Sequence, residues 1–162
     1  MEIWLILRAL ALLAAANGAP VIAKSLFGRR CAWPLDFGTR FIDGRPLLGP
    51  SKTIRGVLLG TLAASVLAGP FGLDWTTGAL VGMTAMAGDL LSSFVKRRLG
   101  LRSSGEAPGL DQVPESLIPL VVCRPLLGLD LAQTLLATGL FWMGELVVSR
   151  LLYRLGLRDR PY

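Results

Sequence analysis

The sequence predicts an all-α membrane protein, built as a bundle of five transmembrane helices with two substantial cytoplasmic loops. Three observations predict this class. The 162 residues are 52% hydrophobic and only 17% charged, which is more apolar than a soluble domain. Four segments of about 20 residues are almost continuously apolar, the length that crosses a bilayer as a helix. Nineteen Gly and ten Pro are tolerated in membrane helices but do not suit a soluble helix bundle.

The apolar segments place the expected spans along the chain. The four strongest candidates are Ile3–Ile22, Val57–Leu73, Trp75–Val95 and Leu131–Leu152. Leu117–Leu129 is a weaker apolar stretch with two prolines, and it forms either a short fifth span or a re-entrant segment. The first apolar segment ends in small residues, as a signal peptide does. It carries Glu2 and no early basic residue, however, so we expect a retained first helix.

The distribution of basic residues favours five spans and sets their direction. With five spans, the Lys24–Arg55 loop, the Lys96–Glu115 loop and the C-terminus share one side, where almost all basic residues lie. The positive-inside rule then places this side in the cytoplasm, with the N-terminus outside the cell membrane and the C-terminus inside. Four spans would place the basic C-terminal tail outside.

Composition also limits the partners and the chemistry. The formal net charge of +6 is concentrated in loops beside apolar spans, which favours anionic lipids and nucleotides over nucleic acid. No polar stretch is long enough to bury its own core, so residues 1–162 form a single membrane domain. The chain has no His, which excludes a His metal site or a His general base. Cys31 and Cys123 lie on opposite sides in this topology, so we expect no disulfide.

A polar face ends the third expected span. Asp89, Ser93 and Lys96 fall within about 60° of arc on one face of a helix, and Arg98 points away from that face. An ionised carboxylate is costly at membrane depth, so Asp89 should lie near the cytoplasmic face with a positive partner. A divalent metal that carries a nucleotide phosphate fits this requirement. The alternative is a snorkelling Lys96 beside a helix-end acid, with the basic run Lys96–Arg98 as an orientation signal.

The loop Asp36–Gly56, which reads DFGTRFIDGRPLLGPSKTIRG, carries the second polar group. It fails as a P-loop, because Lys52 comes three residues after Gly49 and no strand precedes it. Its end still predicts an anion site, since Lys52, Thr53 and Arg55 lie where a helix is expected to begin. The alternative is a turn with orienting charges.

Two further polar residues fall inside expected spans. Asn17 lies near the inner end of the first span, where a helix-packing hydrogen bond and a role in substrate binding are both open. Glu145 lies late in the last span. Arg8 of the first span should lie on the opposite side of the membrane, so we do not pair it with Glu145.

Taken in order, these motifs resemble those of the CDP-archaeol synthases. NGAP, DGRPLLGPSKTIRG, GDLLSSFVKRRLGL, GLDQ and YRLGLRDRPY cover almost the whole chain. The resemblance implies a small membrane cytidylyltransferase of phospholipid biosynthesis with five transmembrane helices. Such an enzyme transfers CMP from CTP to a lipid phosphomonoester with Mg²⁺ as cofactor, giving a CDP-lipid and pyrophosphate.

The same resemblance implies roles for individual residues. Asp89 and Asp111 match the acids that handle the metal, and with Lys52 and Lys96 they are the expected catalytic residues. The expected substrate contacts are Asn17, Asp36, Asp43, Arg45, Lys52, Thr53, Arg55, Ser93, Lys96 and Arg97. No protein partner is indicated.

Departures from the family pattern leave the lipid open. Ile54 stands where the family often has Trp, and neither Glu115 nor the stretch Ser116–Leu129 matches it well. A phosphatidate cytidylyltransferase that uses a diacyl lipid is therefore the nearest alternative, and a membrane transporter or scaffold is a more distant one. A CDP-alcohol phosphatidyltransferase would need several Asp on one span, whereas the third span has only Asp89.

Overall fold

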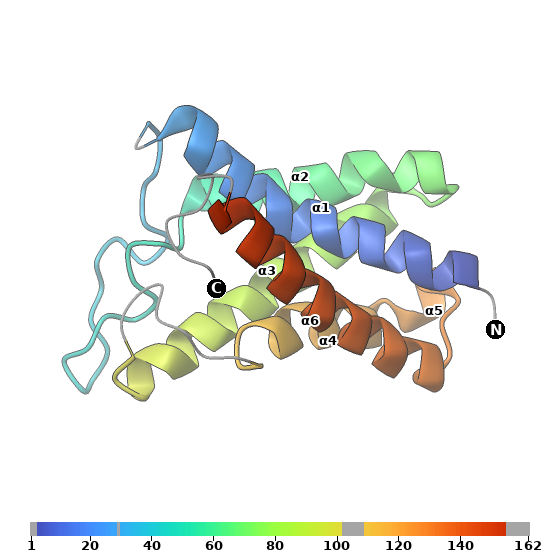
Figure 1. Cartoon of the computed structure of the whole chain (residues 1–162). Helices are drawn as coiled ribbons and strands as arrows, with labels where there is room; N and C mark the ends of the chain where they lie inside the picture. The colour runs from blue at the N-terminus through green and yellow to red at the C-terminus, as the bar shows by residue number, and fades with distance from the viewer. Residues whose placement is uncertain (1–2, 29, 102–108, 155–162) are drawn as a thin grey trace.

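The computed structural model describes residues 3–28, 30–101 and 109–154, which fold as a bundle of helices (Figure 1). The elements are α1 (Ile3–Phe27), α2 (Ile54–Ala68), the 3-10 turn η1 (Gly69–Phe71), α3 (Trp75–Arg98), α4 (Gln112–Val122), α5 (Arg124–Leu127) and α6 (Leu131–Arg154). The predicted all-α class is confirmed.

Four helical segments in the described part of the chain are long and apolar enough to cross a membrane: α1, α2 with η1, α3 and α6. The helix α4 is apolar but has only 11 residues, so it rises about 16 Å against a hydrocarbon core of about 30 Å. Helix length alone therefore does not establish the predicted fifth span. The helix begins at Gln112, earlier than expected, and the chain bends at Cys123 before α5.

Small residues bring the central helices together. The helix α3 packs most extensively against α2 and α4, and α2 also packs along α1. A Cβ atom on Gly82 would lie 2.7 Å from Cα of Thr61 on α2, which is closer than real side chains come. Gly78 is equally crowded by α2. Small residues at these positions therefore let the backbones of α2 and α3 pack closely.

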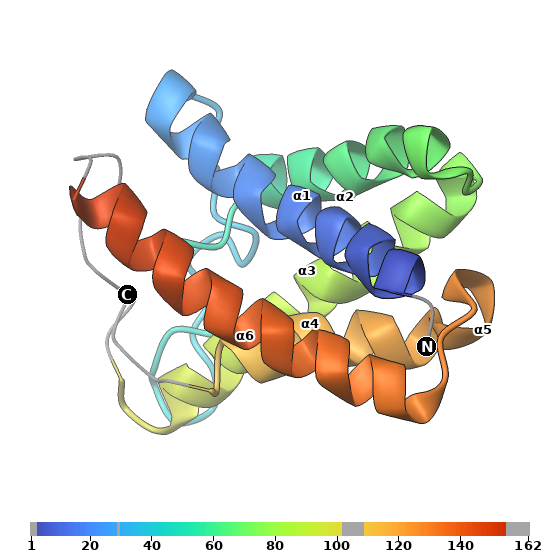
Figure 2. The same cartoon turned by 45° about the vertical axis from the view of Figure 1, so that its right-hand side comes forward.

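The two ends of the bundle differ in character (Figures 1 and 2). The loop 28–53, the end of α3 and the end of α6 gather at one end, while the start of α1, η1 and α5 gather at the other. Contacts at the second end agree, since Arg8 donates a hydrogen bond to the carbonyl of Leu127 and the rings of Trp4 and Phe71 lie 5.6 Å apart. We call the first end, with residues 28–53, 96–101 and 109–115, the polar end.

Within this loop, residues 30–53 have a defined backbone path. Isolated antiparallel bridges join Pro34 to Thr53 and Arg40 to Pro46, so the loop forms a narrow flap that returns to the start of α2. Cys31 in this loop is exposed, whereas Cys123 is buried, and both are free thiols. The predicted absence of a disulfide is confirmed.

Candidate active site

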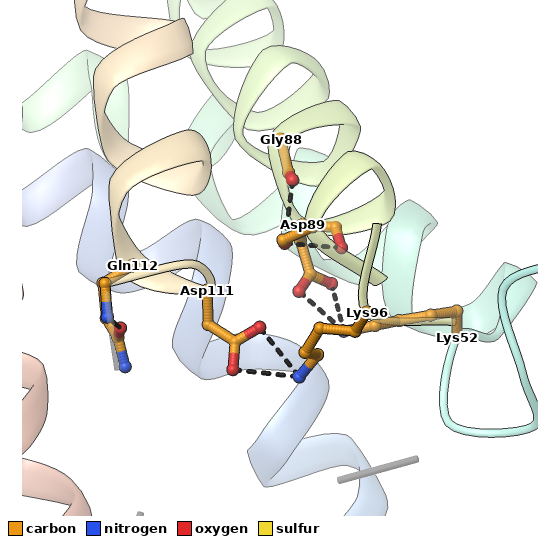
Figure 3. Close-up of polar contacts among 8 residues, drawn as sticks. Lys52, Gly88, Asp89, Lys96, Asp111 and Gln112 are labelled. Atoms are coloured by element: carbon orange, nitrogen blue, oxygen red, sulfur yellow. Dashed lines mark hydrogen bonds and ion pairs between the residues drawn. The ribbon is translucent and has the colours of Figure 1, made fainter. Parts of the chain in front are cut away.

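An ion pair joins the end of the flap to α3. Lys52 lies just before α2, whose first turn is capped by Thr53, because the Thr53 hydroxyl accepts a hydrogen bond from the N–H of Gly56 at 3.1 Å. The Nζ atom of Lys52 lies 2.6 and 2.7 Å from the two carboxylate oxygens of Asp89 (Figure 3). The helix start expected near Thr53 is confirmed, and it directs Lys52 to the acid that the sequence singled out.

A second ion pair joins α3 to the start of α4. The Nζ atom of Lys96 lies 2.8 and 2.9 Å from the carboxylate oxygens of Asp111 (Figure 3). Asp111 directly precedes α4, and Lys96 stands two turns after Asp89 on α3. Four charged side chains from the flap, α3 and the start of α4 therefore lie at the polar end of the bundle.

These charges are partly withdrawn from water. The side chains of Lys52 and Asp89 are 21% and 24% exposed, and those of Lys96 and Asp111 are 9% and 28% exposed. Charges at such depth need opposite charges or ions close by. The site consequently offers carboxylates to a cation and ammonium groups to an anion, the combination that a metal–nucleotide complex requires.

Two more predicted residues of α3 are buried beside these pairs. Ser93 is 3% exposed and Arg97 is 6% exposed. Arg97 lies within electrostatic range of Asp111, so it adds positive charge next to the Lys96–Asp111 pair. The predicted polar face of α3 is therefore buried within the bundle at the polar end.

Glu115 is a site residue whose role the sequence did not reveal. It is 5% exposed and lies within electrostatic range of Glu145 on α6, and of Asp89 and Lys52. The sequence feature that could have pointed to Glu115 is its spacing. It follows Asp111 by four residues, about one helical turn, so the two side chains lie on the same side at the start of α4.

Asn17 and Arg55 make their described contacts outside this cluster. The amide of Asn17 donates to the carbonyl of Leu13, one turn earlier in α1, at 3.1 Å. The Arg55 guanidinium donates to the carbonyls of Gly28 and Arg30, so it fastens the end of α1 to α2. Their contact with substrate stays a prediction.

Asp36 organises the flap from within. Its carboxylate accepts hydrogen bonds from the backbone N–H groups of Gly38, Leu48 and Gly49 at 3.0, 2.9 and 2.9 Å. Burial alone would raise the pKa of Asp36, but these N–H donors favour the ionised form and bring its pKa below the ordinary value of 3.8. Asp36 is thus a charged anchor of the loop that carries Lys52.

Asp43 and Arg45, at the tip of the flap, contact the end of α3. Asp43 pairs with Arg98 at 2.7 Å, and Arg45 donates to the carbonyls of Arg97 and Arg98. Arg98 does point away from Asp89, as expected, but it holds the flap rather than serving only as an orienting charge. Arg102, which follows in the loop after α3, lies outside the described residues.

The acids at this site fit a magnesium ion. In the described part of the chain, no group of three or more His, Cys, Asp or Glu side chains is arranged to hold a metal. Mg²⁺ does not need one, since it commonly binds one or two carboxylates and takes its other ligands from water and substrate phosphates. Asp89 and Asp111, both partly exposed, are the residues that would hold it.

Comparison with known proteins gives the family. The model of the CarS-like CDP-archaeol synthases matches residues 2–72 and 63–162. The chain belongs to the CDP-archaeol synthase family. The CDP-archaeol synthase of Pyrobaculum calidifontis is 34% identical over 91% of this chain and 90% of that protein. The one from Sulfurisphaera tokodaii is 31% identical over 91% and 89%.

Other relatives match over a shorter stretch. The CDP-archaeol synthase of Hyperthermus butylicus is 44% identical over 105 residues, and the chain spans 60% of that protein. For Methanopyrus kandleri the identity is 49%, and the chain spans half of that protein. A solved structure of an intramembrane enzyme of archaeal membrane-lipid biosynthesis superimposes with a TM-score of 0.74 at 34% identity, over 90% of both chains. This family member is thus an integral, multi-pass membrane protein.

Proposed function

We propose that this protein transfers CMP from CTP to a lipid phosphomonoester and so makes a CDP-lipid of the CDP-archaeol type. Family membership supports the reaction class. The observation that supports the chemistry is the pair of contacts Lys52–Asp89 and Lys96–Asp111 at one end of an apolar bundle. This end can bind a triphosphate and its cation, while the lipid chains remain in the bilayer.

In the proposed reaction, a phosphate oxygen of the lipid attacks the α-phosphorus of CTP. The bond from the α-phosphorus to the oxygen that bridges it to the β-phosphorus breaks, and pyrophosphate leaves with that electron pair. A phosphomonoester is already a competent nucleophile, so the absence of His is no obstacle. The protein has to hold the reacting groups in line and offset the charge of the leaving pyrophosphate.

The lysines are assigned to the phosphates and the acids to the metal. Lys52 adjoins the N-terminus of α2, where free N–H groups and the helix dipole already favour an anion. Lys96 and the buried Arg97 approach the phosphates from α3. Asp89 and Asp111 would hold Mg²⁺, which when bound would offset phosphate charge.

The lipid is expected to be archaetidic acid, an ether-linked isoprenoid phosphate, because the relatives are CDP-archaeol synthases. The test supplies purified protein with labelled CTP, Mg²⁺ and either archaetidic acid or a diacyl phosphatidic acid. We expect pyrophosphate release with the ether lipid and none with the Asp89→Asn variant. Product with the diacyl lipid alone would assign the other lipid class. Failure with both lipids would reject the proposed reaction and leave a transporter or scaffold.

We also propose that α4 and α5 complete a fifth crossing, with the polar end in the cytoplasm. Asp111 meets Lys96 at the polar end, and Leu127 meets Arg8 at the opposite end. Residues 112–127 between them, α4 and α5 with the bend at Cys123, would rise at most about 24 Å if they ran straight, and local thinning of the bilayer can match a short crossing of this kind. The basic residues of the flap and of the end of α3 then face the cytoplasm, as the positive-inside rule requires.

The native cysteines offer a test of this orientation. Cys31 is exposed on the flap, and Cys123→Ala leaves it as the single thiol. A membrane-impermeant maleimide should label Cys31 in broken cells but not in intact cells. Asp74→Cys, in a chain with both native cysteines replaced, should react in intact cells. Labelling of Cys31 from outside would reverse the orientation.

A further inference from the structure

We infer that Arg98 and Asp43 are positioning residues, which hold the flap over the site while Lys52 exchanges its carboxylate partner for phosphate. The inference rests on the proposed function for its kinetic effect. We call the contact between residues 41–46 and the end of α3 the loop clasp; its members are Phe41, Asp43, Arg45, Pro46, Phe94 and Arg98.

Arg98 is the centre of the loop clasp. Its Nη1 atom lies 2.7 Å from Oδ1 of Asp43, and its Nη2 atom donates to the carbonyl of Pro46. The guanidinium lies 4.6 Å from the centroid of the Phe41 ring and 5.0 Å from that of Phe94. The two rings meet edge to face at 5.3 Å. Arg98 therefore binds the flap by charge, by a hydrogen bond and by cation–π contact.

Arg98 reaches from α3 to the flap, whereas Arg45 reaches from the flap to α3. Its guanidinium donates to the carbonyls of Arg97 and Arg98 at the C-terminal end of α3. Carbonyls at a helix C-terminus lack helical partners and favour a cation. The Asp43 carboxylate also accepts from the N–H of Arg45 at 3.1 Å, which ties the two halves of the loop clasp together.

A continuous series of contacts links the loop clasp to Lys52. The N–H of Leu47 donates to the carbonyl of Thr39 at 2.9 Å, and the next two N–H groups bind the Asp36 carboxylate. Leu35 then donates to the carbonyl of Lys52 at 2.8 Å. A displacement of the flap tip would thus be transmitted to the backbone of Lys52.

The flap is consequently attached to α3 at two points. One is the Lys52–Asp89 pair and the other is the loop clasp, nine residues or about 13 Å further along the same helix. In the proposed reaction Lys52 binds phosphate, so the first attachment is given up for substrate. The loop clasp uses neither Lys52 nor Asp89, and it keeps the flap in place during that exchange.

The test compares Arg98→Ala, Asp43→Ala and the double variant with the wild-type enzyme. We expect Arg98→Ala to raise KM for CTP about tenfold, with little change in kcat or in KM for the lipid. The double variant should be no worse than the more affected single variant, because both changes open one contact. Arg98→Lys should recover part of the loss. Arg150→Ala, an exposed arginine of α6, is the matched control.

Hydrogen exchange gives a readout that needs no activity. Amides of residues 41–47 should exchange faster in Arg98→Ala, and amides of α3 before residue 94 should not. An unchanged KM for CTP in an active enzyme, or equal losses for CTP and lipid with a lower melting temperature, would overturn the inference. An inactive wild-type enzyme would instead reject the proposed function. Hydrogen exchange would then test only the structural part of the inference, that Arg98 holds the flap. Unchanged exchange rates at residues 41–47 in Arg98→Ala would overturn that part.

Discussion

Lys96 and Arg98 stand two residues apart in one basic run, yet they serve different regions of the molecule. Lys96 pairs with Asp111 inside the polar end and its side chain is 9% exposed, whereas Arg98, whose side chain is 20% exposed, pairs with the exposed Asp43 of the flap. Two residues turn a helix by about 200°, so the residues face opposite sides. A buried charge that loses its partner costs far more than an exposed one, and the two regions should therefore differ in their sensitivity to mutation.

The largest effect is expected at the acids of the Lys52–Asp89 and Lys96–Asp111 pairs. Asp89→Asn or Asp111→Asn keeps the side-chain shape but removes the charge that would hold Mg²⁺, and it leaves a lysine without its partner. Turnover should fall by orders of magnitude, measured as initial pyrophosphate release from protein that inserts and purifies normally. Asp74→Asn, an exposed acid at the other end of the bundle, should retain activity. Near-normal turnover in either site variant would remove the metal assignment.

The lysines of the same pairs come next. Lys52→Ala and Lys96→Ala should each lower kcat/KM for CTP by about ten- to a hundredfold, the value of a charge-assisted contact. That loss should exceed the one for Arg98→Ala. Lys24→Ala, at the exposed end of α1, serves as the control. If Lys96 and Arg98 prove equally sensitive, the contrast between a buried site and an outer clasp is wrong.

Part of this arrangement could be predicted from sequence, and part could not. Hydropathy predicted the four long helices, and helical spacing placed Asp89, Ser93 and Lys96 on one face, because both are local properties of the chain. Spacing could not pair Lys52 with Asp89, since they lie 37 positions apart, with all of α2 and part of α3 between them. The contribution of Glu115 was missed for the same reason, because its partner Glu145 lies on another helix.

The number of spans shows the limit of hydropathy most clearly. Residues 112–127 are divided by the bend at Cys123, so they lack the single long helix that a window of 20 apolar residues detects. Their ends are defined instead by tertiary contacts, Lys96 with Asp111 and Arg8 with Leu127. Such contacts depend on packing among helices that are distant in sequence.

A smaller effect is expected where α3 and α4 touch. A Cβ atom on Gly88 would overlap the carbonyl of Pro114, so Gly88→Ala should push the start of α4 away and with it Asp111. We expect a loss of about 1–3 kcal/mol in stability, typical of overpacking, together with a moderate loss of activity. Gly139→Ala on α6, where a Cβ atom meets open space, is the matched control for thermal unfolding. Equal melting temperatures for the two variants would contradict this contact.

The smallest effect is expected at Asp36, and its pH dependence separates the flap from the buried pairs. The pKa of Asp36 is lowered in the folded protein because three backbone N–H groups favour the carboxylate. A lowered folded pKa stabilises the flap above the unfolded value of 3.8, and this contribution is lost only as the pH falls through the still lower folded pKa.

Between pH 5 and pH 8, Asp36 should therefore stay ionised and contribute a constant amount. Asp36→Asn keeps one acceptor oxygen, so kcat/KM for CTP should fall only about two- to fivefold, less than one full charge-assisted contact. In Asp36→Asn, the Leu48 and Gly49 amides should lose protection from hydrogen exchange. After correction for intrinsic rates, this loss should be equal at pH 5 and pH 8. A deficit confined to the higher pH would mean that Asp36 titrates near neutrality. In that case its backbone donors would not hold the carboxylate ionised, and the flap would depend on the loop clasp alone.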